Sequence, residues 1–101
     1  MNNTKWRELQ LAMHQLKELS PQWRTCCITN GYVSDWDGEW YYHFSEGGFQ
    51  DIEWLEIKVD SLEQKDLVFS ELKKIHVPGQ ESEYGFKVFG FVVEGVSVEY
   101  L

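Results

Sequence analysis

Carboxylates are the side chains of this sequence that are numerous and closely spaced enough to suggest a chemical role. They are concentrated in residues 31–60. That stretch holds eight acidic residues and one lysine, a local charge of −7, whereas the whole chain carries −8. Eight aromatic residues share the same stretch. Carboxylates attract a cationic partner, and large aromatic side chains supply contact area. The composition therefore predicts an acidic surface that recognises a basic partner. The alternative is an inert solvated face with the aromatics turned into the core.

Seven residues of this stretch are the candidates for contact with a basic partner. The carboxylates would supply charge, and the two aromatics would supply packed contact area. The predicted partner-binding residues are Asp35, Trp36, Asp37, Glu39, Tyr41, Asp51 and Glu53.

Metal-binding patterns are incomplete in this sequence. A calcium loop that starts at Asp35 needs glycine at its sixth position, but Trp40 stands there. An Asp-Gly turn between strands is the simpler interpretation of Asp37-Gly38. The three histidines, His14, His43 and His76, lack the spacing of a zinc site. We therefore predict no metal site and no cofactor.

Catalytic patterns are equally weak. Cys27 with His43 as its base would form a nucleophile across neighbouring strands, but buried structural cysteines are far commoner. Asp35 and Asp37 could act as an acid–base pair on a sugar, yet a chain of 101 residues leaves little room for the necessary cleft. We predict that the protein is not an enzyme.

Length and composition place the chain among cytoplasmic single-domain proteins. Its 101 residues correspond to one domain, residues 1–101, and its 43% apolar content suffices for one core. No apolar run is long enough to span a membrane, and the N-terminus lacks the pattern of a signal peptide. The adjacent Cys26 and Cys27 would point to opposite faces of a strand, so they are not a natural disulfide pair. A pI near 4.7 disfavours nucleic acid and anionic membranes as partners.

The apolar periodicity predicts an α+β fold. Residues 4–19 form an amphipathic helix, and Ser61 with Gln64 forms a capping box that opens a second helix over residues 62–76. Strands are expected at residues 23–29, 40–44, 52–59, 86–93 and 96–101, with a hairpin at Gly47-Gly48 and a polar loop over residues 79–85. The phase change around Trp54 indicates either a bulge or burial of both strand faces. The order is α-β-β-β-α-β-β, with two helices on one face of a mostly antiparallel sheet of four or five strands.

The expected core combines the apolar stripes of both helices with the inward positions of the sheet. Its predicted members are Trp6, Leu9, Met13, Leu16, Leu55, Ile57, Leu72, Ile75, Phe89 and Phe91.

Four sequence strings resemble a family of small bacterial proteins of unknown function. They are SDWDGEWYYHF at 34–44, IEWLEI at 52–57, HVPG at 76–79 and the terminal VEYL, together with a first helix that carries Trp6. The resemblance spans nearly the whole chain and implies no catalytic residues. In size and acidity the chain also resembles the immunity proteins that accompany bacterial toxins, including those of contact-dependent growth inhibition.

These features predict an immunity protein that binds and neutralises a cognate toxin domain, a basic nuclease. Nuclease sites are cationic because they hold phosphates, and an acidic surface can occupy such a site. Two alternatives remain open from the sequence. One is a non-inhibitory adaptor that binds its partner by strand addition. The other is a small-ligand or sugar binder that uses Trp36, Trp40 and Trp54 as stacking platforms.

Overall fold

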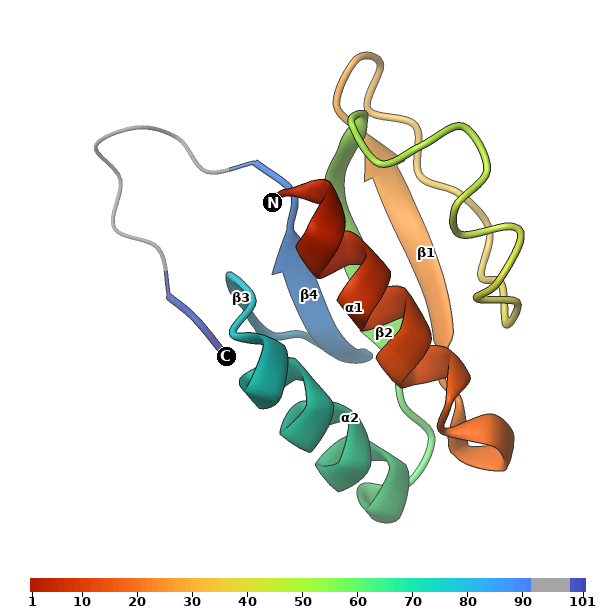
Figure 1. The fold of residues 1–101 in the computed structure, drawn as a ribbon, viewed down its shortest axis with the longest axis vertical. Coiled ribbons are helices and arrows are strands. Elements are labelled where there is room, and N and C mark those ends of the chain that lie inside the picture. Colours follow the sequence, from red (N-terminus) through yellow and green to blue (C-terminus); the bar gives the residue numbers. More distant parts are fainter. Residues whose placement is uncertain (92–98) are drawn as a thin grey trace.

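A four-stranded antiparallel sheet packs against two helices in the computed structural model, which describes residues 1–91 and 99–101 (Figure 1). The strand order in the sheet is β1-β2-β4-β3, and every neighbouring pair is antiparallel. The predicted α+β class is confirmed. The elements are α1 (Asn3–His14), a 3₁₀ helix (Lys17–Leu19), β1 (Gln22–Cys27), β2 (Ile52–Lys58), α2 (Leu62–Ile75), β3 (Gly79–Glu81) and β4 (Gly85–Phe89).

Local capping explains where both helices begin. The Asn2 side chain accepts the backbone N–H of Lys5 and caps α1, which begins one residue before the predicted start at residue 4. α1 ends at His14, earlier than predicted. At α2 the Ser61 hydroxyl accepts the Gln64 amide, as the capping box predicted. The Gln64 side chain reaches back to the N–H of Asp60 and also donates to the Leu19 carbonyl.

The helices cover one face of the sheet and enclose the core (Figure 1). Buried side chains come from α1, from α2, from the inward positions of the strands, and from the long connection between β1 and β2. The core consists of Trp6, Leu9, Met13, Trp23, Trp40, Phe44, Phe49, Ile52, Leu55, Ile57, Val68, Leu72, Val77, Phe86 and Val88. Of the other predicted members, Leu16 and Ile75 are only partly buried against this cluster.

Cationic and aromatic side chains cover the opposite face of the sheet, which we call the plated face. Arg24 on β1 lies opposite Glu56 on β2 and forms an ion pair with it at 2.8 Å. The Arg24 guanidinium lies 4.4 Å from the ring centroid of Trp36 and 5.3 Å from that of Tyr84. Aliphatic stems and cation–π contacts thus shield this face. Phe89 was predicted in the core. It pairs with Trp54 instead and is half-buried on the plated face.

The predicted strand at residues 40–44 is wrong. Residues 40–47 form consecutive turns, and Trp40 and Phe44 both point into the core with their rings 4.9 Å apart. A spacing of four residues on one side is helical, so core packing overrides the strand preference of aromatic residues. The expected hairpin at Gly47-Gly48 is therefore absent, and β1 pairs directly with β2.

Three other sequence predictions are revised or only partly tested. The expected polar loop contains β3, which pairs with β4. Phe91, predicted in the core, is 48% exposed. The predicted strands over residues 86–93 and 96–101 extend into residues 92–98, which lie outside the described residues.

The bulge interpretation near Trp54 is confirmed, because the β1–β2 register shifts between Cys26 and Cys27, opposite residues 52–54.

Irregular segments cover both edges of the sheet in part. Along β1, the backbone of Trp23 exchanges two hydrogen bonds with Asp37, and Cys26 bridges Val33. Beside β3, Gly79 donates to the Glu99 carbonyl at 3.0 Å. These pairings occupy backbone groups that an added strand would need. None of the described helices has the length and apolar character to cross a membrane.

Candidate interaction surface

The structure separates the acidic residues of the middle segment into two groups. One group is used inside the fold, where carboxylates accept hydrogen bonds from backbone amides or pair with a base. The other group is exposed, with Asp51 and Glu53 at one end of the sheet and Asp60 beyond the opposite end of β2. The seven residues predicted to bind a partner are therefore not brought together on one surface.

Glu39 belongs to the first group. Its carboxylate accepts three backbone N–H groups, from Tyr41 at 3.0 Å, Tyr42 at 2.8 Å and His43 at 2.7 Å. These bonds, that of His43 most strongly, hold the pKa of the Glu39 carboxyl below its ordinary value. The carboxylate thus caps the turn over residues 40–47 in the way that an acidic residue caps a helix.

Asp37 also serves the fold. One carboxylate oxygen accepts the Glu39 amide at 2.8 Å, and the other lies 2.8 Å from Nδ1 of His43. This hydrogen bond and the negative charge of Asp37 raise the pKa of His43. The Asp37-Gly38 turn expected from the sequence is therefore a side-chain-stabilised turn next to the edge of β1.

The remaining residues of the predicted string lie on different sides of the molecule. Trp36 packs on the plated face of the sheet against Arg24 and Tyr84. Tyr41 is exposed on the other side, with its ring 5.6 Å from that of His14 on α1. Asp35 is exposed. Trp40 is buried, so it cannot serve as the sugar platform considered above.

Asp51 and Glu53 lie where β1 ends, β2 begins and β4 ends. The Asp51 carbonyl accepts the N–H of Ile28, and the Glu53 carbonyl accepts the N–H of Gly90, each at 2.8 Å. Both acidic residues are exposed. Four apolar side chains at the same end of the sheet are 40–65% exposed, with Ile28 and Phe91 next to these bonds and Tyr32 and Val33 along the end of β1. We call this set the sheet-end surface: Ile28, Tyr32, Val33, Asp51, Glu53 and Phe91.

A cavity of about 240 Å³ adjoins the sheet-end surface. Asp51 and Glu46 line it, together with Cys27 and His43, which the sequence analysis considered as a nucleophile and its base. No hydrogen bond joins the Cys27 thiol to the His43 ring among the described residues. The neighbouring Cys26 donates its S–H to Glu53 at 3.3 Å, and burial, followed by this carboxylate, raises the pKa of the Cys26 thiol. A raised pKa keeps that thiol protonated and unreactive.

Sequence reasoning missed the apolar part of the sheet-end surface. Ile28 was placed within a strand and Phe91 within the core, whereas the structure exposes both. One available signal was the Asn30-Gly31 turn, because apolar residues on both sides of a turn at the end of a strand are candidates for exposure. Within residues 1–91 and 99–101, no three metal-ligating side chains are grouped closely enough to hold an ion.

Fold and surface together define a small α+β protein with an acidic and partly apolar candidate surface at one end of its sheet. The chain belongs to the family of unknown function DUF6678, whose model matches residues 1–95. The resemblance to an uncharacterised family is thereby confirmed. No curated protein and no solved structure matches the chain.

Proposed function

We propose that this protein is an immunity protein, which binds a cognate bacterial toxin domain, a basic nuclease, and blocks it. One observation supports this best: large apolar side chains and carboxylates are exposed at the same end of the sheet. Exposed apolar patches with a charged rim are typical of protein interfaces. The protein would act in the cytoplasm by binding and not by catalysis.

The charge of the chain supports a basic partner. At −8 the protein attracts cationic proteins at long range, and Asp51 and Glu53 bring that charge to the apolar contact area. The phosphate-binding site of a nuclease is cationic and would be complementary to these carboxylates. Tyr32, at 65% exposure, supplies an aromatic contact of the kind that dominates binding energy.

Strand addition, the binding mode considered for an adaptor, has less support. Residues 32–37 already occupy backbone groups along β1, and residues 99–101 do the same beside β3. A partner would have to displace these pairings first. Binding through side chains at the end of the sheet requires no such rearrangement.

Binding kinetics test the proposal, with the purified product of a neighbouring toxin gene as the partner. The double variant D51N/E53Q should associate about tenfold more slowly at low salt, and the difference should shrink as salt rises. Truncation by Y32A should instead raise the dissociation rate about tenfold, with little dependence on salt. Both variants should also protect cells less well than the parent protein.

The matched control is D66N/E83Q, which removes the same charge from exposed positions away from the sheet-end surface. If the control slows association as much as D51N/E53Q does, only the net charge matters. If D51N/E53Q and Y32A both bind and protect like the parent, the sheet-end surface is not the interface.

A further inference from the structure

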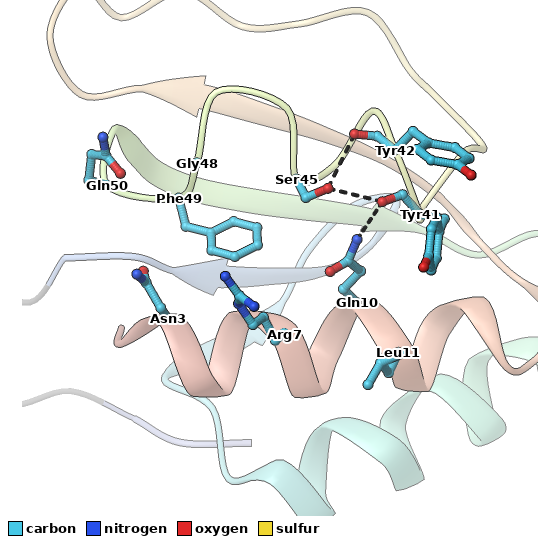
Figure 2. Close-up of a pocket in the computed structure, with 10 residues that line it drawn as sticks. All are labelled: Asn3, Arg7, Gln10, Leu11, Tyr41, Tyr42, Ser45, Gly48, Phe49 and Gln50. Atoms are coloured by element: carbon cyan, nitrogen blue, oxygen red, sulfur yellow. Dashed lines mark hydrogen bonds between the residues drawn. The ribbon is translucent and has the colours of Figure 1, made fainter.

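A cleft of about 460 Å³ lies between α1 and the turns that precede β2 (Figure 2). α1 contributes Asn3, Arg7 and Gln10, whose spacing of four and three residues places them on one side of the helix. The opposite wall includes Tyr41, Tyr42 and Ser45. The volume falls within the range of small-molecule sites.

Hydrogen bonds hold the two walls of this cleft together. Nε2 of Gln10 donates to the carbonyl of Trp40 at 2.8 Å and to that of Tyr41 at 2.7 Å. Within the wall opposite α1, the Ser45 hydroxyl donates to the Tyr41 carbonyl at 3.0 Å (Figure 2). Phe49 lines the cleft and is buried against Trp6 of α1. The cleft is therefore preformed, which lowers the entropic cost of binding a ligand.

The charge of the cleft is opposite to that of the chain. Arg7 is the only charged residue among the described side chains that line it, although the sequence contains 17 acidic residues. No carboxylate of the described residues forms an ion pair with Arg7. Its planar guanidinium can thus make two parallel hydrogen bonds to an incoming anion.

The other lining groups restrict the ligand further. Tyr41 and Tyr42 place two exposed rings at the cleft, with their centroids 4.8 Å apart and their planes at 80°, so that one ring face can pack on the C–H face of a sugar ring. Their hydroxyls can bond to the hydroxyls of a ligand, whereas the amides of Asn3 and Gln50 lie at the other end of the cleft (Figure 2). One cation matches one carboxylate, whereas a phosphate dianion in so acidic a protein would require more positive charge.

We propose that this cleft binds a small sugar carboxylate of the uronic acid type. The carboxylate pairs with Arg7, and the ring lies against Tyr41 and Tyr42. This site is distinct from the sheet-end surface, so it does not depend on the proposed immunity function.

Titration of the isotope-labelled full chain, followed by amide chemical shifts in NMR, tests this site with three probes at constant ionic strength. Glucuronate should give saturable shifts at cleft residues with a Kd of about 1 mM, the value expected for a ligand of this size. Glucose, the neutral counterpart, and inorganic phosphate, which lacks the ring, should each bind at least about tenfold more weakly.

Two variants assign the binding to named side chains. R7Q and Y42A should each weaken glucuronate binding about tenfold, and neither should disturb the core because both side chains are exposed. K17Q is the matched control, since it removes an exposed cation outside the cleft, and it should bind like the parent. The proposal fails if glucuronate gives no saturable shifts, if glucose or phosphate binds as well, or if R7Q binds glucuronate normally.

Discussion

The carboxylates held within the fold and those at the end of the sheet have the same chemistry and different surroundings. Glu39 and Glu56 accept hydrogen bonds from the protein itself, through three backbone amides and through Arg24 respectively. Asp51 and Glu53 are exposed residues; one Glu53 oxygen accepts the Cys26 S–H, and Asp51 bonds to its own chain through its backbone carbonyl. A carboxylate that is already bonded within its own chain stabilises the fold. One that is exposed beside apolar side chains is free to meet a partner.

Removal of Arg24 should cause the largest loss of folding stability among the changes that test this comparison. The variant R24M leaves the Glu56 carboxylate, whose side chain is only 5% exposed, without its ion-pair partner. Loss of one partner of a buried pair costs about 3–5 kcal/mol, and the partial exposure of Arg24 reduces the expected value to about 2–3 kcal/mol. Urea denaturation monitored by tryptophan fluorescence measures the loss.

The double variant R24M/E56L is the control for this prediction. It removes both charges and should recover most of the stability, because well-packed apolar residues replace buried ion pairs at little cost. If R24M unfolds at the same urea concentration as the parent, Glu56 is not a carboxylate that depends on the fold.

Truncation of Glu39 should have an intermediate effect. E39A removes the acceptor for three amides and should cost about 1 kcal/mol at pH 7, as loss of a helix cap does. The folded-state pKa is lowered, so this contribution is complete above the ordinary value of 4.5 and disappears as the pH falls through the folded-state pKa.

Denaturation at pH 7 and at pH 3 measures the difference between E39A and the parent, which should shrink at the lower pH. E46A is the control within the same turn, because Glu46 is exposed. An equal loss of stability in both variants would show that the cap made by Glu39 has no special role.

Neutralisation of the exposed carboxylates should have the smallest effect on stability. D35N and D51N should each change the free energy of unfolding by less than about 0.5 kcal/mol, because exposed charges interact weakly through water. Thermal melting at low and high salt measures this effect. A loss of 1 kcal/mol or more in D51N would place Asp51 with the carboxylates that hold the fold together.

The acidic stretch shows how far the sequence could predict the candidate site. Its charge and aromatic content drew attention to the segment, and the structure exposes Asp51 and Glu53, two of the residues predicted to contact a partner. Asp37 and Glu39 were predicted to contact a partner, and the structure shows both as acceptors within the fold. Asp37 accepts the Glu39 amide and bonds to the His43 ring, and Glu39 accepts three amides of a turn that was expected to be a strand. Phe91 was assigned to the core because it belongs to a strongly apolar run. The residues of that run do not indicate at which position burial ends.

The sequence by itself determined the α+β class, the two helices and much of the core. Periodicity, caps and turn residues act over a few neighbours, so they can be recognised in the chain. Tertiary structure alone decided which carboxylate paired with Arg24 and which stayed exposed. These choices depend on contacts such as Arg24 with Glu56, whose partners are 32 positions apart and meet only when β1 pairs with β2. The cleft that contains Arg7 arises in the same way, because its walls meet through Gln10 of α1 and Trp40, which are 30 positions apart.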